Sequence, residues 1–343
     1  MATESGALDA VDRQILHAMH IAPRAPFARI ATVLDVSEQT VARRYQRMRG
    51  AGVVRVVARP EPTRQPGASY WTLRIGCRPG TASALAEALA RRADTSWISI
   101  GAAGAEITCQ AEAGHDHGGL LHHLPRASNV LAFSAHQMMH HFVGRGESDW
   151  IAPEHEVTEE QRAYLAEGTM NQAGVMQRPG AQLATGARLT TDDVRLLEAL
   201  ARDGRSSWAA LATATGWSQR QAAHRVNELA AAGAIYFHLD VADALVGVRS
   251  VANLWFTVAP AHLARVGARL ADHPELPFVA AVTGNTNLMA SVRTVDAEAL
   301  YRYLTTKVAD IEGIHTVEIV PHLARIKQSH SLMVDGLVRE PPR

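Results

Sequence analysis

A short stretch of the chain, from Ser37 to Met48, gathers many hydrogen-bond donors at helical spacing. Ser37 is a residue type that caps helix N-termini well, and Val41, Tyr45 and Met48 recur so that they form one apolar face. The opposite face carries the polar side chains Gln39, Thr40, Arg43, Arg44 and Arg47. Guanidinium groups match phosphates and guanine edges, and amide and hydroxyl groups can hydrogen-bond other bases. This face therefore predicts contact with nucleic acid.

The arginines of this stretch create a strong local positive charge. Between Ser37 and Arg64 there are seven arginines against two glutamates, a local charge of +5. The whole chain of 343 residues has 34 basic and 34 acidic residues, so its net charge is zero and no overall field attracts it to nucleic acid. Binding would depend on this patch. A solvated helix face is the alternative interpretation, because that is the usual fate of surface charge.

Two more helical segments precede this stretch and must position it. They span 11–19 and 27–34, with Pro23 and Pro26 between them. Three helices with a tight turn before the third predict a helix-turn-helix. The third helix should end at residues 50–52, and residues 53–57 predict a short β-wing.

The N-terminal region resembles the winged helix-turn-helix of the leucine-responsive and asparagine-operon (Lrp/AsnC) family of transcriptional regulators. The resemblance is carried by Leu8-Asp9, Asp12, Ile15-Leu16, Ile30-Ala31, Val36-Ser37, Thr40-Val41, Arg44, Met48 and Gly52-Val53-Val54. It implies a regulator that binds double-stranded DNA. The predicted DNA-binding residues are Ser37, Gln39, Thr40, Arg43, Arg44 and Arg47. Arg43 and Arg47 are expected to face phosphate or guanine edges, with Gln39 and Thr40 near bases at the helix start.

The chain is an internal repeat with an offset of 181 residues. Aligned pairs include Leu8 with Leu189, Asp12 with Asp193, Ser37 with Ser218, Arg44 with Arg225, Gly52 with Gly233 and His141 with His322. Repetition at a fixed offset predicts two copies of one architecture. The predicted domains are a winged helix-turn-helix at 1–60, a regulatory domain at 61–143, a linker at 144–188, a second winged helix-turn-helix at 189–245 and a second regulatory domain at 246–330.

Each winged helix is followed by the same order of strands and helices. In the second half, strands are predicted at 251–258, 278–282, 287–292 and 316–320, with helices at 261–272 and 295–311. In the first half, strands are predicted at 69–77, 96–101, 105–111 and 133–139, with helices near 81–92 and 117–127, the latter interrupted by Pro125. The order βαββαβ predicts an α+β fold with two ferredoxin-like domains. It also matches the amino-acid-metabolism regulatory domain of the Lrp/AsnC family.

The connecting and terminal segments carry weaker signals. Within the linker, residues 158–167 predict one helix capped by Thr158, and residues 168–186 predict a flexible segment because they are poor in large apolar side chains. The tail from Ser331 to Arg343 is expected to be frayed.

The two winged helices differ in charge. The window from Ser218 to Leu245 has two arginines against three acids, a local charge of −1. Phosphate contacts dominate affinity for DNA, so the first copy is the expected DNA-binding one, and a packing role is equally compatible with the second. Arg44 could pack back on its own domain, because its equivalent Arg225 is retained in the copy without the basic patch. In the second copy the candidate contact residues are Gln219, Arg220, Gln221 and His224.

The resemblance also implies a small-molecule effector. In the family, effector amino acids bind between regulatory domains near the turn before the third strand, where a glycine and an acid recur. The predicted effector-binding residues are Gly104, Glu106, Gly284 and Asn287. Glu106 supplies a carboxylate that suits an ammonium group, whereas Asn287 replaces the acid in the second copy. The alternative is that Gly284 forms a tight turn and Asn287 caps it.

Histidines crowd the first regulatory domain without a recognised metal spacing. They are His115, His117, His122, His123, His136, His140 and His141. Scattered histidines are favoured over a metal or haem site because neither an HExxH motif nor a Cys/His zinc pattern is present. The only cysteines, Cys77 and Cys109, exclude a disulfide framework and are expected to be buried and free. We predict no metal and no cofactor.

The sequence therefore favours a tandem-duplicated regulator of the Lrp/AsnC type that is not an enzyme. Its two regulatory sheets are expected to pair as a pseudo-dimer, and further chains to assemble into a homo-oligomer. A cytoplasmic location is expected, because no apolar run approaches the roughly 20 residues of a membrane span and the first residues lack a signal peptide. Two alternatives are a tetrapyrrole (sirohaem-type) decarboxylase, because some proteins that resemble this family in both domains have that activity, and an effector sensor that does not bind DNA.

Overall fold

The computed structural model describes residues 8–61, 69–113, 119–143, 156–166 and 189–340. They form two compact units. The helical unit takes its residues from 1–65, 151–246 and 337–340, and the sheet unit from 66–150, 247–336 and 341–343. No helix within the described ranges combines the length and the apolar character that a bilayer crossing requires.

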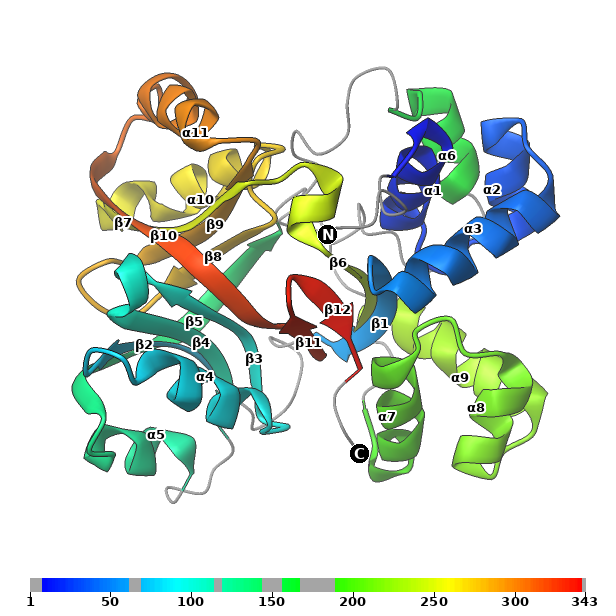
Figure 1. Ribbon diagram of the computed structural model, residues 1–343, viewed down its shortest axis with the longest axis horizontal. Helices are drawn as coiled ribbons and strands as arrows, with labels where there is room; N and C mark the ends of the chain where they lie inside the picture. The colour runs from blue at the N-terminus through cyan, green and yellow to red at the C-terminus, as the bar shows by residue number, and fades with distance from the viewer. Residues whose placement is uncertain (1–7, 62–68, 114–118, 144–155, 167–188, 341–343) are drawn as a thin grey trace, which may run out of the picture. The chain divides into compact units, whose positions relative to one another are not determined.

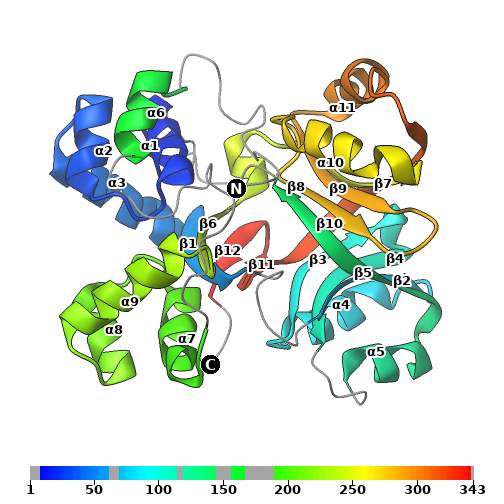
Figure 2. The same ribbon diagram turned by 180° about the vertical axis from the view of Figure 1, so that it is seen from behind.

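The helical unit contains both winged helices. Its helices are α1 (Ala10–Ile21), α2 (Phe27–Leu34) and α3 (Glu38–Ala51) in the first copy, and α7 (Val194–Arg202), α8 (Trp208–Thr215) and α9 (Gln219–Ala231) in the second. It also contains α6 (Glu159–Ala166) and the strands β1 (Val54–Pro60), β6 (Ile235–Val241) and β12 (Leu337–Arg339). Figures 1 and 2 show the three helices of each copy gathered together, in blue for the first and lime green for the second.

Local sequence sets the ends of the third helix in each copy. Ser37 accepts a hydrogen bond from the backbone N–H of Thr40 at 3.1 Å, as predicted for an N-cap. Gly52 ends α3 in the left-handed conformation, with φ at 76°, which glycine adopts without strain. Ser218 repeats the cap in the second copy by accepting from the N–H of Gln221 at 3.2 Å. The predicted apolar face of α3 is buried.

Strand β1 does not form a free wing. It pairs antiparallel with β6, its equivalent in the second copy, with Val54 opposite Val241. Val57 lies opposite His238, and the repeat offset relates these two residues, so the pairing has pseudo-twofold symmetry about them. The prediction of a wing at 53–57 is wrong in this respect. All but the last residue of β1 is buried, the arginines Arg55 and Arg59 included.

Helix α6 packs against the first winged helix. Thr158 and Gln161 exchange hydrogen bonds at its start, at 2.8 and 3.2 Å, so the predicted cap is confirmed. The side-chain amide of Gln161 donates to the carbonyl of Val33 at 2.9 Å, and Arg29 donates to the carbonyl of Tyr164 at 3.1 Å. Residues 156–166 therefore belong to the helical unit, whereas the predicted flexible segment 168–186 lies outside the described residues.

The sheet unit contains two halves with the predicted order of elements. The first half has β2 (Ser69–Cys77), α4 (Ala82–Ala90), β3 (Thr95–Gly101), β4 (Glu106–Ala113), α5 (Leu120–His123) and β5 (Val130–Val143). The second half has β7 (Ser250–Val258), α10 (Leu263–Ala271), β8 (Phe278–Val282), β9 (Leu288–Thr294), α11 (Ala297–Tyr303), a π-helix η9 (Leu304–Val308), β10 (Ile314–Gln328) and β11 (Ser331–Val334). The helix predicted at 117–127 is short, because Pro125 turns its second part into a 3-10 segment.

Strand pairing joins the two halves into a closed ring. Within each half the strands follow the order fourth, first, third, second, which is β5-β2-β4-β3 and β10-β7-β9-β8. In addition, β5 pairs with β8 and β10 pairs with β3, so the edges of the halves are joined reciprocally. β5 and β10 extend beyond the predicted strands at 133–139 and 316–320 because their far ends pair with the other half. The predicted pairing of the two sheets in one chain is confirmed.

Helices cover one face of each half. Helix α4 packs with Leu73, Ile75 and Ile107 in one apolar core, and α10 packs with Leu254 and Phe256 in the other. Figures 1 and 2 show α4 and α5 beside the first-half strands, and α10 and α11 beside the second-half strands. The opposite face carries a smaller cluster around Trp255, which is fully buried.

The tail is more ordered than predicted. Residues 331–334 and 337–339 form β11 and β12, separated by Asp335 and Gly336, whose φ angles are 52° and 74°. An Asp-Gly pair with both φ angles positive is the preferred two-residue turn between strands, and the sequence carried this signal. The N–H of Val338 donates to the carbonyl of Gly52 at 2.7 Å within the helical unit.

Candidate functional site

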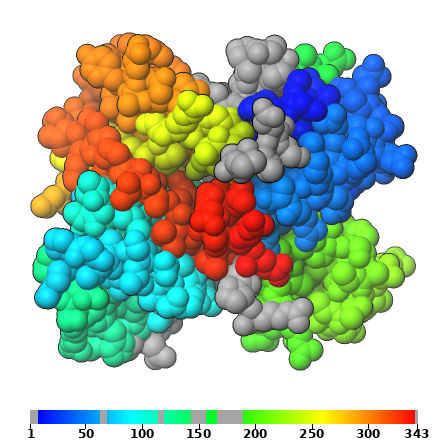
Figure 3. Space-filling view, viewed as in Figure 1, coloured from blue at the N-terminus to red at the C-terminus, as the bar shows by residue number. Residues whose placement is uncertain are grey.

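The outer face of α3 carries the predicted DNA-binding residues. Gln39, Arg43 and Arg47 are exposed, and Thr40 is half-buried. The Ser37 hydroxyl forms the helix cap and lies 2.8 Å from the hydroxyl of Thr40, so both hydroxyl groups already have one hydrogen-bond partner. Figure 3 shows α2 and α3, in blue, at the surface.

Arg44 belongs to an ion-pair network at the base of α3. Its guanidinium donates to Asp9 at 2.6 Å and to Asp12 at 2.9 Å, and Asp12 is fully buried. These hydrogen bonds, first to Asp9 and then to Asp12, raise the pKa of Arg44. Burial raises the pKa of Asp9, but the hydrogen bonds from Arg44 and the backbone of Asp12, with the charges of Arg44 and Arg47, together outweigh it, so the net shift is downward. The network joins α3 to the start of α1, so Arg44 packs back on its own domain.

Arg43 and Arg47 differ in their contacts with the rest of the protein. Arg47 pairs with Asp12, yet about half of its side chain (52%) remains exposed. Arg43 is exposed and forms no ion pair with any described residue. A guanidinium has five N–H donors, so Arg47 can pair with Asp12 through Nη2 and still offer other donors to a phosphate.

Several other arginines counted in the predicted basic patch do not face solvent. Arg49 pairs with Asp203 at 2.9 Å. Arg55 and Arg59 are only 6% and 9% exposed on β1, and Arg55 donates to the carbonyl of Arg339 at 3.3 Å. Arg64 lies outside the described residues. The count of +5 therefore overstates the patch, because a count of charges ignores those that are buried or paired.

The second copy repeats the base of the network without the exposed arginines. Arg225 binds Asp193 with two hydrogen bonds, at 2.8 and 2.7 Å, and also pairs with Glu228 at 2.8 Å. On the outer face of α9, Gln219, Arg220, Gln221 and His224 are exposed, as Gln39, Arg43 and Arg47 are on α3. The amide of Gln221 accepts from the N–H of Ser218 at 2.9 Å, so it is engaged in the cap.

In the first half of the sheet unit, the predicted effector carboxylate is already paired. Glu106 accepts two hydrogen bonds from Arg74, at 3.0 and 2.8 Å, and Arg74 also binds Glu318 of β10 at 2.8 and 2.6 Å. The hydrogen bond from Arg74 lowers the pKa of Glu318. The Arg74 guanidinium lies 5.0 Å from the ring centre of Trp255. Gly104 lies in the turn just before β4, with φ at 90°.

In the second half, the predicted effector residues hold the turn between β8 and β9. Asn287 accepts from the N–H of Val258 at 2.9 Å and donates to its carbonyl at 2.8 Å. An aspartate could not make both contacts, because a carboxylate has no hydrogen to donate. Gly284 has φ at 115°, and a Cβ there would lie 2.6 Å from Nδ1 of His136. The four predicted residues therefore lie in two separate turns, and sequence reasoning missed their partners Arg74 and Glu318.

The histidines of the first half are not gathered around one point. His136 lies 2.7 Å from the carbonyl of Thr283 and 3.1 Å from the hydroxyl of Ser134. His122 contacts Arg126, and His141 stacks near Phe278. His115 and His117 lie outside the described residues. Within the described ranges, no three His, Cys, Asp or Glu side chains are placed to hold a metal ion. Both cysteines are buried and free.

Comparison with known proteins gives one consistent family. The AsnC-type helix-turn-helix domain matches residues 8–49 and 189–230, and the Lrp/AsnC ligand binding domain matches residues 251–332. The Bkd operon transcriptional regulator of Pseudomonas aeruginosa is 31% identical over 161 residues, which are 46% of this chain and 99% of that protein. An HTH-type transcriptional regulator of Pyrococcus horikoshii is 29% identical over 127 residues, 37% of this chain and 80% of its own.

Some solved structures are similar over nearly the whole chain. The siroheme decarboxylase NirDL superposes with a TM-score of 0.58, covers 93% of this chain and 93% of its own, and is 10% identical. At that identity the likeness concerns the fold alone.

Proposed function

The chain belongs to the Lrp/AsnC family of DNA-binding transcriptional regulators, and from this premise we propose that its first winged helix makes the base and phosphate contacts. The observation that carries the proposal is the exposed face of α3, where Arg43 and Arg47 both reach solvent. The equivalent face of α9 offers a single arginine, Arg220. Since phosphate contacts supply most of the affinity for DNA, the two copies should contribute unequally.

The proposed contacts divide into two kinds. Arg43 and Arg47 bind phosphates or guanine edges, and Gln39 and Thr40 contact bases near the start of α3. Ser37 fixes the helix end through its cap, and Arg44 acts indirectly by holding α3 against α1 through Asp9 and Asp12. Arg43, which forms no ion pair with a described residue, is therefore the position where substitution should change affinity without affecting the fold, whereas Arg47 also pairs with Asp12.

We also propose that a small molecule such as an amino acid controls DNA binding through the regulatory halves. Each half is interpreted as a ferredoxin-like unit, which the strand order fourth, first, third, second supports. Gly104, Glu106, Gly284 and Asn287 remain the positions suggested by the family. Their present partners mean that an effector at Glu106 would have to compete with Arg74.

An assembly of chains and a cytoplasmic location complete the proposal. One chain already joins its two copies through β1 with β6 and through β5 with β8, so it resembles a dimer in its pairing. Association of several such chains would bring several copies of α3 to one operator, which is how helix-turn-helix proteins match repeated half-sites. We propose the cytoplasmic location because a DNA-binding regulator must act where the DNA is.

The test is the salt dependence of binding to a fluorescent fragment of the protein's own promoter, followed by anisotropy. The Arg43→Ala/Arg47→Ala variant should bind more weakly, and its slope of log affinity against log salt should be shallower by about 1 to 2. The matched control is Arg220→Ala/His224→Ala on α9, which should bind like the wild type. Equal losses in both variants, or none in the first, would contradict the proposal.

Two alternative functions would give different experimental results. A tetrapyrrole decarboxylase, suggested by the family resemblance and by the likeness of fold to NirDL, requires a bound macrocycle. A strong visible absorbance band after incubation with iron-uroporphyrin would favour it. A sensor that does not bind DNA would show no sequence-selective binding at any salt concentration. We propose that the chain is not an enzyme, because its family matches are to regulators.

A further inference from the structure

The loop at residues 203–206, between α7 and α8 of the second winged helix, contacts the first winged helix directly. Arg205 donates to the backbone carbonyls of Pro23 and Ala25, at 2.7 and 2.9 Å. The repeat offset relates Arg205 to Arg24, which donates in return to two backbone carbonyls of the 203–206 loop. A guanidinium that meets two carbonyls is fixed by two directional bonds, so this exchange sets how the two copies meet.

Arg205 also stacks on aromatic rings of the first copy, one of which belongs to α3. Its guanidinium carbon lies 4.3 Å from the ring centre of Phe27 and 5.6 Å from that of Tyr45. The Phe27 and Tyr45 rings are themselves 5.5 Å apart, and Tyr45 is on the buried face of α3. An arginine over an aromatic ring is attracted to it, so Arg205 holds α3 from behind.

The reciprocal arginine makes its contacts elsewhere. The guanidinium carbon of Arg24 lies 4.5 Å from the ring centre of Trp208, at the start of α8, and 5.4 Å from that of Phe237 on β6. At the position of Tyr45, α9 carries Val226, which offers no aromatic ring. The stacking on a third helix is therefore a feature of α3, the helix with the exposed arginines.

An ion pair adds a second contact to α3 in the same direction. Arg49 of α3 pairs with Asp203 at 2.9 Å, and the other oxygen of Asp203 accepts from the N–H of Arg205 at 2.9 Å. Asp203 thus joins the ion pair to the stacked arginine. At the repeat offset, Ala230 replaces Arg49 and Ala22 replaces Asp203, so the second copy cannot receive this ion pair from the first.

The loop is also packed tightly on β1, the strand that follows α3. The N–H of Gly204 donates to the carbonyl of Val56 at 2.7 Å. A Cβ at Gly204 would lie 2.8 Å from Cγ1 of Val56 and 3.0 Å from the carbonyl carbon of Val57. The loop therefore has little freedom to shift on the first copy.

We propose that the 203–206 loop positions α3 for reading DNA, so that the second winged helix serves the first as a scaffold. Asp203 and Arg205 are positioning residues, because they act on DNA through α3. The proposal rests on the proposed function, in which α3 contacts the operator. It accounts for a complete second winged helix whose own third helix lacks the exposed arginines, since the fold of that copy presents the loop.

The charge of Asp203 separates this role from simple electrostatics. If Asp203 only neutralised Arg49, Asp203→Asn would free a guanidinium, strengthen binding to any DNA sequence and steepen the salt slope by up to about 1. If Asp203 positions α3, the same change weakens binding to the promoter relative to unrelated DNA, because base contacts depend on exact placement.

The test is the ratio of affinities of the full chain for its own promoter fragment and for a scrambled fragment of equal length, measured by anisotropy. Asp203→Asn and Arg205→Met should each lower this ratio about fivefold or more, the effect of one badly placed base contact. Asp203→Glu keeps the carboxylate and should restore most of the ratio. The control Arg13→Met removes an inter-copy hydrogen bond made from α1 and should leave the ratio unchanged.

Hydrogen exchange tests the positioning without DNA. In both variants the amides of α3 should exchange faster, while those of α9 keep their protection. Unchanged exchange in α3, or faster exchange with an unchanged affinity ratio, would overturn the proposal. Stronger binding of Asp203→Asn to both fragments would also overturn it. If the wild type shows no selective binding, the proposed function fails, and the exchange of α3 still decides whether the loop holds this helix. Should Arg205→Met not fold, Asp203→Asn alone decides the outcome.

Discussion

Arg44 donates to the buried carboxylate of Asp12 at 2.9 Å, and 181 residues later Arg225 makes the same contact with Asp193 at 2.7 Å. The pair survives in the copy that lacks exposed arginines on its third helix at the positions of Arg43 and Arg47. In both copies this pair therefore fixes the third helix against the first one, and the proposed DNA contacts come from other residues. This explains why a single arginine persists at this position in both copies while the charge around it differs.

Replacement of the buried acid should destabilise the helical unit. Asp12→Asn removes the charged partner of Arg47 and one of the two charged partners of Arg44, which keeps Asp9. We therefore expect a loss of about 1 to 2 kcal/mol in the free energy of unfolding. Asp193→Asn should behave alike. Urea unfolding followed by circular dichroism measures both. The control is Asp192→Asn, an exposed neighbour without an ion pair among the described residues, and an equal effect there would contradict the interpretation.

Acid should remove the contribution of Asp193. Burial raises the pKa of this carboxyl, but the hydrogen bonds from Arg225 and Thr190 and the charge of Arg225 together outweigh it, and the net pKa lies below the ordinary 3.8. A depressed pKa means that the folded state holds the charged form more firmly, so the stabilisation is present above about pH 4 and is lost as the pH falls below it. The Asp193→Asn variant should lack this acid-dependent part of the unfolding free energy.

The turn at Gly284 gives a test of its structural role. Gly284→Ala would require a left-handed residue with its Cβ only 2.6 Å from Nδ1 of His136, which is itself 2.7 Å from the carbonyl of Thr283. We expect a loss of about 2 to 3 kcal/mol in the free energy of unfolding, measured by thermal unfolding. Gly80→Ala is the matched control, because Gly80 also has a positive φ but open space around it, and about 1 kcal/mol is expected there. Equal losses in the two variants would mean that the close approach to His136 does not contribute to the cost at Gly284.

The elements of the fold were predictable where local pattern decides them. The helix caps at Ser37 and Ser218, and the strands of both halves, follow from residue type and periodicity. The pairing of β1 with β6 was missed, although four of the residues 53–57 are valines, which favour a buried strand. The turn at Asp335-Gly336 was not predicted, although an Asp-Gly pair favours a two-residue turn between strands.

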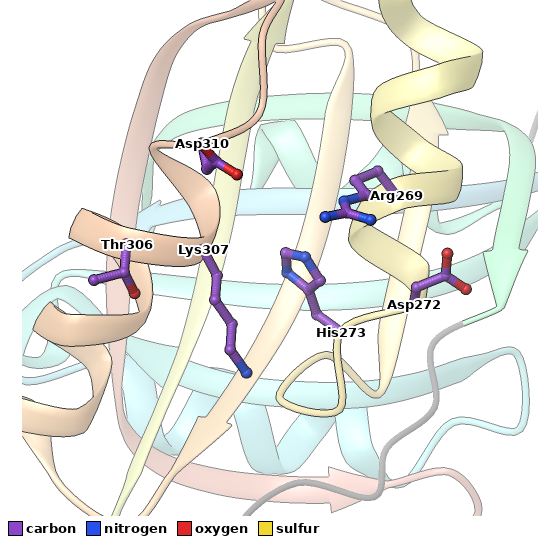
Figure 4. A pocket seen from close by; sticks show the side chains of 6 residues that line it. All are labelled: Arg269, Asp272, His273, Thr306, Lys307 and Asp310. Carbon is purple, nitrogen blue, oxygen red and sulfur yellow. The ribbon is translucent and has the colours of Figure 1, made fainter.

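The candidate sites were less predictable, because side-chain partners come from distant residues. Arg44 meets Asp12, 32 residues away, and Arg74 meets Glu318, 244 residues away. A local charge count treats these groups as available when they are paired. A pocket in the second half of the sheet unit was missed for the same reason, since its residues come from two segments that share no local motif. Figure 4 shows its lining side chains, which are Arg269, Asp272, His273, Thr306, Lys307 and Asp310.

His322 should make the sheet unit sensitive to mild acid. Burial, followed by the nearby charge of Arg325, lowers the pKa of His322 to about 3, and its Nε2 lies 3.2 Å from the hydroxyl of Ser99. The unfolded chain therefore binds a proton that the folded state does not, so stability falls as the pH drops from about 6.5 toward 3, by at most about 1.4 kcal/mol per pH unit. His322→Gln should flatten this dependence in urea unfolding, whereas His315→Gln, exposed on the same strand, should leave it unchanged.

The contact of Gly267 with Phe142 joins α10 of the second half to β5 of the first. A Cβ at Gly267 would overlap the Phe142 ring, so Gly267→Ala should destabilise the sheet unit by about 1 to 3 kcal/mol despite the better helix propensity of alanine. Gly50→Ala, in a helix with open space around it, should be neutral or stabilising. If the two halves pack as a pair, adding Phe142→Leu to Gly267→Ala should recover part of the loss, because the smaller side chain makes room. Additive effects of the two changes in thermal unfolding would show that the contact does not couple the halves.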